Sequence, residues 1–290
     1  MPVRAGRWIV RLVAPVAALV ASFSLVACRL NAASAEGSLS ATASDAKSLI
    51  VKNENGSVEI VKDPAATELQ IVAKVRCAAE SKEAAEARLK ATRLLAERDA
   101  EGRVRVQVAF PSREPAAMTV VLNASTEGAS LVIRAANLDG IEVETSNGSI
   151  TCGAFAGLAK LGSSNGSIRI DGHAGPVHLD TSNGAIEATG VGTPVIAETS
   201  NGRIEVSLSD SATGDVKIDT SNGRAELRLS KAWQGTVRAE TSNGSIEALA
   251  PTATVINERD EATVTFGDGT KAKATIDTSN GRVTIRGPAK

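Results

Sequence analysis

The sequence predicts an all-β fold: a β-solenoid built of coils of about 18–21 residues, with an N-terminal cap of strands and one α-helix. Three observations predict it. A four-residue motif, Thr-Ser-Asn-Gly, returns at nearly constant spacing along the C-terminal half of the chain. Apolar residues alternate on both sides of each copy, and further glycines separate the units. Internal repeats of this length are typical of solenoids, in which each unit packs on its neighbours.

Residues 1–27 are expected to be a secretory signal peptide. Arg4, Arg7 and Arg11 precede an uncharged apolar run, 12–27, which is shorter than the roughly 20 apolar residues that a permanent transmembrane helix needs. The run ends in Leu-Val-Ala before Cys28. This resembles the lipobox of bacterial lipoproteins, which implies that Cys28 becomes the first mature residue and carries a lipid. An ordinary signal peptide with an incidental cysteine is the alternative.

Residues 28–46 are rich in alanine and serine and contain little apolar bulk, so we expect a tether. Residues 47–135 are expected to form strands and one helix that cap the solenoid, although a separate small domain is an alternative. Strands are predicted over 49–61, 69–77 and 103–110, and a helix over 78–99, which ends before Gly102. Such a cap would cover edges that the first coil leaves unpaired.

Residues 136–290 contain the repeats. The motif copies start at 145, 163 (with Ser in place of Thr), 181, 199, 220, 241 and 278, so the gaps are 18, 18, 18, 21, 21 and 37 residues. The last gap spans about two periods, which suggests a coil around 258–261 that lost its motif. Residues 52–56 look like a degenerate first copy. The conserved asparagines of the copies are Asn147, Asn165, Asn183, Asn201, Asn222, Asn243 and Asn280.

The apolar alternation indicates two short strands per unit, each with one buried face. Asn-Gly would turn the chain between them, because both residues tolerate positive φ. Hairpins in a meander would also fit. Stacked coils are favoured because only stacking explains why the flanking Thr and Ser recur: identical residues then form ladders that share hydrogen bonds.

The chemistry-bearing residues do not indicate an enzyme, and no cofactor is expected. No Gly-x-Ser-x-Gly elbow or phosphate-binding loop occurs. His173 and His178, the two histidines, are interpreted as surface residues. The charge of −1, from 32 basic and 33 acidic residues, gives no indication of a nucleic-acid partner.

A row of carboxylates before the motif is a weak candidate for calcium: Glu144, Asp180, Glu198, Asp219, Glu240 and Asp277, interrupted by Gly162. Arg203, Arg224 and Arg282 follow the motif glycine in three copies and would neutralise this row. A solvated, charge-balanced face is therefore the preferred interpretation. Trp233 is a candidate contact residue for sugars, with a packed turn anchor as the alternative.

Cys77 and Cys152 both fall on apolar phases of their strands. We expect them to be buried as small apolar side chains, and a disulfide between them stays open.

The repeated Thr-Ser-Asn-Gly-x-Ile and the closing segment 267–285 (Gly-Asp-Gly…Thr-Ser-Asn-Gly-Arg-Val-Thr-Ile) resemble the putative-adhesin family of bacterial envelope β-solenoid proteins. The likeness covers about residues 47–290. It implies a β-solenoid fold and a cell-envelope location, in the outer membrane or at the cell surface if the host has two membranes. It implies adhesion more weakly, and it transfers no binding residues.

The sequence therefore predicts a lipid-anchored envelope protein that presents a repetitive surface, as an adhesin, binding or structural module. Its partners would be the membrane, through the lipid, and an envelope polymer or protein. An envelope-stress or signalling accessory protein that binds a membrane partner is the alternative, and a carbohydrate-active β-helix enzyme is a third.

Overall fold

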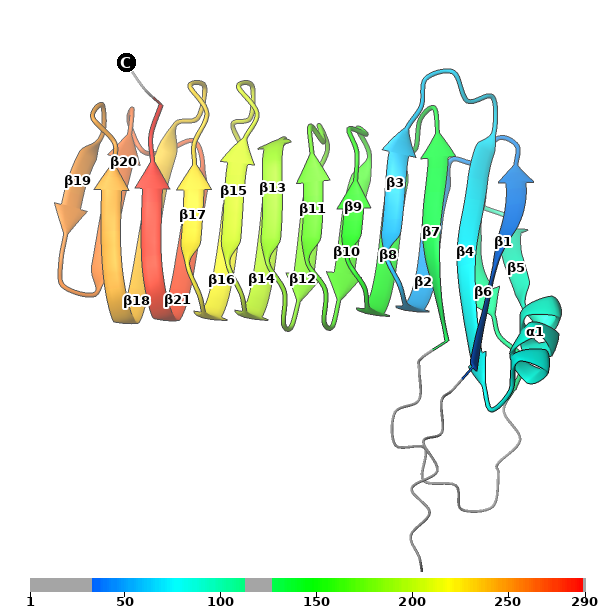
Figure 1. Cartoon of the computed structure of the whole chain (residues 1–290). Coiled ribbons are helices and arrows are strands. Elements are labelled where there is room, and N and C mark those ends of the chain that lie inside the picture. The colour runs from blue at the N-terminus through cyan, green and yellow to red at the C-terminus, as the bar shows by residue number, and fades with distance from the viewer. Residues whose placement is uncertain (1–32, 113–126, 289–290) are drawn as a thin grey trace, which may run out of the picture. The chain divides into compact units, whose positions relative to one another are not determined.

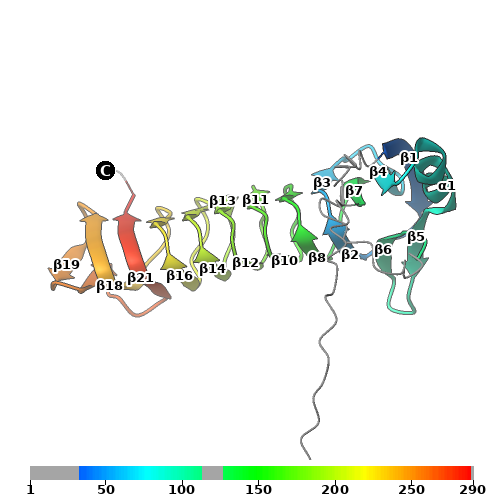
Figure 2. The same ribbon diagram turned by 60° about the horizontal axis from the view of Figure 1, so that its bottom comes forward.

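The computed structural model describes residues 33–112 and 127–288, which belong to one compact unit. Its β-strands form two facing sheets, and each repeat adds one strand to each sheet (Figure 1). The strand pairs of successive repeats lie next to one another along the stack, as Figure 2 shows from a second direction. The predicted β-solenoid is confirmed, and the meander of hairpins is not.

The strands of the first sheet follow one another in space in an order that differs from their order in the chain. This order is β5 (Arg93–Arg98), β6 (Arg103–Ala109), β2 (Ser48–Asn55), β8 (Gly140–Asn147), β10 (Leu158–Ser163), β12 (Val177–Thr181), β14 (Val195–Asn201), β16 (Val216–Asn222), the first parts of β21 (Lys273–Arg286) and β18 (Gly235–Leu249), β20 (Glu261–Phe266) and β19 (Thr254–Asn257).

The second sheet has the same progression. It runs β1 (Ala33–Ala43), β4 (Leu69–Ala79), β7 (Gly128–Ala135), β3 (Val58–Lys62), β9 (Ile150–Cys152), β11 (Ile168–Asp171), β13 (Ile186–Val191), β15 (Ile204–Leu208), β17 (Ala225–Arg228) and the last parts of β21 and β18.

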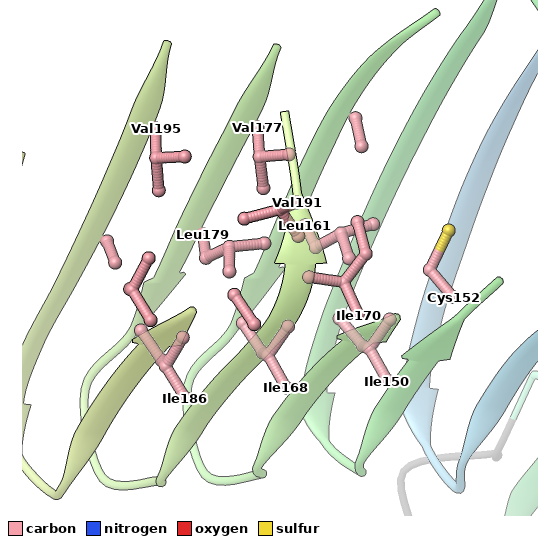
Figure 3. Packing of buried hydrophobic residues seen from close by; sticks show 14 of the residues in the cluster. Ile150, Cys152, Leu161, Ile168, Ile170, Val177, Leu179, Ile186, Val191 and Val195 are labelled. Carbon is pink, nitrogen blue, oxygen red and sulfur yellow. The ribbon is translucent and has the colours of Figure 1, made fainter. Parts of the chain in front are cut away.

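The strands of the repeats are parallel and in register, so equivalent residues of successive copies are direct neighbours. Thr181 lies opposite Thr199, and Thr199 lies opposite Thr220. The alternation seen in the sequence places every second side chain between the sheets, where the apolar rows meet. Ile150, Ile168 and Ile186 form one such row (Figure 3). Burying one such side chain stabilises the fold by about 1.5–3 kcal/mol.

The C-terminal strand β21 is inserted between earlier coils. It pairs with β16 and β17 on one side and with β18 on the other, although β18 precedes it in the sequence. The long gap before the last motif is therefore not a coil that lost its motif. Residues 254–266 instead form an antiparallel hairpin, β19 and β20, at the end of the first sheet.

The first coil is inserted in the same way. β2 lies between β6 and β8, and β3 lies between β7 and β9, so residues 48–62 stack directly on the repeats. The degenerate motif copy takes its expected place, with Asn55 opposite Asn147.

Residues 33–43, which the sequence places in the tether, form strand β1. All eleven residues pair with β4. β1 satisfies the backbone groups of β4 on this side, and its alternate residues Ala35, Leu39, Ala41 and Ala43 face the core.

The helix is shorter than predicted: α1 spans Lys82–Ala91. The Oγ of Ser81 accepts a hydrogen bond from the backbone N–H of Ala84 at 3.1 Å and so caps its first turn. Thr92 is already extended, and the remaining residues, 93–98, form β5 against β6. Gly102 does not end a helix. Its φ of +77° closes the turn between β5 and β6.

Candidate functional site

The outer face of the first sheet carries the row of carboxylates that the sequence indicates. In spatial order the row reads Lys52, Glu144, Gly162, Asp180, Glu198, Asp219, Asp277, Glu240 and Glu261. All six candidate carboxylates therefore lie on one line, and five of them are consecutive. Neighbouring parallel strands are about 4.8 Å apart, so like charges accumulate along the row.

Basic residues of the same face offset part of this charge. The distance from nitrogen to carboxylate oxygen is 3.4 Å between Lys52 Nζ and Glu144 Oε2. It is 2.5 Å between Lys217 Nζ and Glu198 Oε1, and 2.6 Å between Arg238 Nε and Glu240 Oε1. The hydrogen bond that the Lys217 ammonium donates to Glu198 raises the pKa of Lys217 above its usual value. Arg203 is not the neutralising group that the sequence suggests, since its Nε lies 3.1 Å from Oε1 of Glu205 in the second sheet.

The carboxylates of the row are not grouped as metal ligands. Within residues 33–112 and 127–288, no group of three or more His, Cys, Asp and Glu side chains is arranged to hold a metal ion. The carboxylates project one per coil, whereas calcium needs six to eight converging oxygen atoms. Partial burial raises the pKa of Asp277, and the negative charges of Glu240 and Asp219 raise it further.

Gly162 interrupts the row and lies in a hollow of about 1040 Å³ on the outer face of the first sheet. Packing does not demand glycine at this position: the nearest atom to an added Cβ would be the backbone O of Val143, at 3.9 Å. A Cβ would fit there, and the missing side chain leaves a gap in the row between Glu144 and Asp180. The gap is therefore the feature of this face that packing does not explain.

The lining of this hollow mixes charged, polar and apolar groups. Lys160 and His178 border Gly162 on the same and the next coil, and Lys160 lies 3.5 Å from Glu142. Asn53 and Gln107 add amides, and Ser164 and Ser182 add hydroxyls. Thr145 also borders the hollow, and its buried hydroxyl has no hydrogen-bond partner within residues 33–112 and 127–288.

One aromatic side chain lines the hollow. Of the four aromatic residues in the described part of the chain, Phe155, Trp233 and Phe266 are buried and Phe110 is half-exposed. Phe110 lies at the edge of the hollow. Trp233 is a packed anchor and not a surface contact: its Nε1–H donates to the backbone O of Gly214 at 2.9 Å, and its ring packs edge-on against Phe266.

The motif asparagines form a continuous ladder along the corner between the sheets. The Nδ2 of each donates to the Oδ1 of its neighbour at 2.9–3.2 Å. The ladder runs through Asn55, Asn147, Asn165, Asn183, Asn201, Asn222, Asn280 and Asn243, and ends with Asn55 donating to the backbone O of Glu127. These residues connect coils and leave their outer faces exposed.

The threonine of the motif is buried beside the ladder. In most copies its hydroxyl donates to the backbone O of the motif glycine in the neighbouring coil, as Thr181 does to Gly166 at 2.9 Å. Thr145 lacks this bond among the described residues, and Asn53 Nδ2 donates to the corresponding acceptor, the backbone O of Gly56, at 2.8 Å.

The two histidines are not a surface pair. His178 is half-exposed, as expected for the outer phase of its strand, but His173 is fully buried in the turn between coils. Its Nε2 lies 2.7 Å from the backbone O of Gly157, and burial lowers its pKa. The turn stacks on equivalent turns that contain Phe155 and Val191, so the position is apolar.

Cys77 and Cys152 are buried, as expected, and both are free thiols. The structure therefore has no disulfide between them, a pairing that the sequence leaves open. Burial raises the pKa of Cys152 to about 12, which leaves it protonated and unreactive. Cys28, the predicted lipidation site, lies outside the described residues. No helix in the described part of the chain has the length and hydropathy to cross a bilayer.

Comparison with known proteins gives one family. The Toastrack DUF4097 family profile matches residues 96–286, about two thirds of the chain. No curated protein matches this chain.

Two crystal structures are similar over 88% of this chain. One, titled a putative cell adhesion protein, from Clostridium sporogenes, is 11% identical, with a TM-score of 0.29 and all of its own chain covered. The other, titled a putative adhesin, from Bacteroides fragilis, is 12% identical, with a TM-score of 0.36 and 97% covered.

Proposed function

Since the chain belongs to the Toastrack DUF4097 family, we propose that it is a binding module of the cell envelope, and not an enzyme. In this proposal it is anchored by a lipid on Cys28 and binds an extended glycan with the outer face of its first sheet. The observation that carries the proposal is the hollow at Gly162, where a row of side chains is interrupted although packing leaves room for one.

The lining of the hollow supports a glycan as the ligand. Hydroxyls and amides such as those of Ser164, Asn53 and Gln107 can hydrogen-bond to sugar hydroxyls, and Phe110 offers an apolar ring to the face of a sugar. The charged groups nearby are largely paired with one another, as in Lys52 with Glu144 and Lys160 with Glu142. The carboxylates of the row would repel phosphate backbones, which argues against nucleic acid.

The regular spacing of side chains along the stack favours an extended ligand. Equivalent side chains return on each coil at about the spacing of adjacent strands, 4.8 Å. A polymer that lies along the row can therefore contact Asp180 and Glu198 with successive units after it fills the gap at Gly162. Single weak contacts would add up along its length.

A binding assay with Gly162→Glu tests the proposal. The new side chain continues the carboxylate row and occupies the gap at position 162, so binding to soluble envelope glycan fragments should weaken by at least about tenfold, or 1.4 kcal/mol. Thr151→Glu is the matched control, because it adds the same charge to the exposed face of the second sheet. Equal binding by the wild type and both variants, or no binding by the wild type, would contradict the glycan site.

The anchor is tested separately by labelling cells with a radioactive fatty acid. The wild-type protein should carry the label and Cys28→Ala should lose it. An unlabelled wild-type protein would remove the anchor and leave the glycan proposal untouched.

A further inference from the structure

The two ends of the stack are finished differently (Figures 1 and 2). At the end formed by β1 and β5, helix α1 packs on β1 and β4, and β1 and β5 also contact each other. Leu89 of α1 lies directly over Gly37, where an added Cβ would be 3.1 Å from its Cδ2. This end is therefore capped, as solenoid ends usually are.

The opposite end has no comparable cover among the described residues. β19 pairs with β20 on one side only, and the last residues of β18 pair only with β21. The outer edges of both strands therefore present backbone N–H and C=O groups that the rest of the described chain does not pair.

Apolar side chains gather at this open end. Six large apolar residues are exposed in the described chain, and three of them lie here: Ile256 is 61% exposed, and Val255 and Leu249 are each 41% exposed. β19, Thr-Val-Ile-Asn, carries no charge and no proline. Natural edge strands are usually very short or carry lysine, proline or a bulge that prevents pairing. β19 is short, with four residues, but it contains neither lysine nor proline.

We propose that two copies of this chain associate end to end through β19, in an antiparallel pair about a two-fold axis. Directly opposed residues of an antiparallel pair lie on the same face of the sheet. Centring the axis on Ile256 places this residue against its own copy and Val255 against Asn257 of the second copy. The first sheet then continues from one copy into the next, and the contact closes as a dimer.

The charges around β19 favour this orientation. The turn between β19 and β20 carries Glu258, Arg259 and Asp260, and Glu261 begins β20, so this end is acidic. The loop after the other end of β20, residues 267–272, carries Lys271 and Asp268, and Lys273 begins β21, so this side is basic. A two-fold axis reverses the strand direction and thus brings the acidic end of one copy to the side of the basic end of the other.

Cysteine cross-linking in the full chain tests the contact. Opposed Cβ atoms in an antiparallel pair lie about 4.5–5.5 Å apart, close enough for a disulfide after small adjustment. Ile256→Cys should give a covalent dimer on mild oxidation. Leu158→Cys is the control: Leu158 is 53% exposed, lies in the middle of the first sheet, and leaves the same native cysteines in place.

Mass measurements by light scattering over a range of concentrations give a second readout. The wild-type chain should form dimers, Ile256→Lys should weaken them by at least about tenfold, and Leu158→Lys should not. Both side chains are exposed, so circular dichroism should show the same fold for all three proteins. A wild-type chain that stays monomeric, equal cross-linking of the two cysteine variants, or a different protein cross-linked to Ile256→Cys would overturn the proposal.

Discussion

The glycines of this protein act in two physically different ways. The sequence suggests that the motif glycines supply positive φ, but among Gly148, Gly166, Gly184, Gly202, Gly223, Gly244 and Gly281 none has it. They are required because coils approach closely: a Cβ on Gly202 would lie 1.9 Å from the backbone O of Gly184. Gly162 lacks this constraint.

Gly202→Ala should therefore destabilise the protein by about 3 kcal/mol, the upper range of overpacking, because the backbone of two coils must separate. Gly162→Ala is the matched control. It should stabilise by about 0.5–1 kcal/mol, since alanine loses less entropy than glycine in a strand. Urea unfolding of both variants measures the difference, and equal effects would show that close approach of coils is not what selects the motif glycine.

His173 predicts a dependence of stability on pH. Its burial lowers its pKa below the ordinary 6.5, so the folded protein holds the neutral form while the unfolded chain binds a proton more readily. The stability that His173 contributes is therefore complete above pH 6.5 and is lost as the pH falls toward the lowered pKa of the folded state.

His173→Val should remove this loss, because valine occupies the equivalent position, 191, in the next coil. Between pH 7.5 and pH 5.0, the melting temperature of the variant should decrease less than that of the wild type. His178 stays in both proteins and shows no comparable burial. An identical decline in the two proteins would exclude His173 as the cause.

At the scale of elements, the asparagine ladder connects coils through a chain of side-chain hydrogen bonds. Asn183 takes part in two of them, with Asn165 and Asn201, each 3.0 Å long. Asn243 ends the ladder and makes one such bond, with Asn280 at 3.2 Å. The recurrence of Asn in the sequence indicates such a ladder because only stacking brings the copies together.

Asn183→Ala should cost about 1–2 kcal/mol and Asn243→Ala about half as much, since a typical net hydrogen bond contributes about 0.5–1.5 kcal/mol. Urea unfolding of the two variants provides the comparison. Equal losses would mean that the bonds between asparagines do not determine the contribution of these residues.

The elements outside the repeats are where prediction from sequence is weakest. Residues 93–98 have good helix formers, but the exposed edge of β6 offers backbone hydrogen bonds that outweigh a small helix propensity. β1 does alternate, with Ala35, Leu39, Ala41 and Ala43 toward the core and polar residues between them. The signal is weak because alanine is a poor strand former, and the partner strand β4 lies far away in the sequence.

At the scale of the whole molecule, the repeat period fixes the stacked coils but not their order. β21 lies between the preceding coil and β18, although it follows β18 in the sequence. This order depends on the hairpin of β19 and β20, which leads the chain back past β18, and the motif spacing does not encode it. The gap at Gly162 is visible in the sequence as a missing carboxylate. The hollow and the place of Phe110 beside it require the packing of β6 against β2.

Everything on the outer face, including the hollow and the carboxylate row, depends on coils that stack in register in this order. A pair of engineered cysteines tests it most directly. Asp219 lies opposite Asp277, and Asp277 lies opposite Glu240. Asp219 and Glu240, although in successive motif copies, are thus two strands apart, or about 9.6 Å, beyond the reach of a disulfide.

The measurement is the yield of intramolecular disulfide in two double variants of the full chain after mild oxidation. Asp219→Cys with Asp277→Cys should cross-link nearly completely, and Asp219→Cys with Glu240→Cys should not. Cross-linking of the second pair in place of the first would show that the coils stack in sequence order, and would contradict the arrangement on which this surface rests.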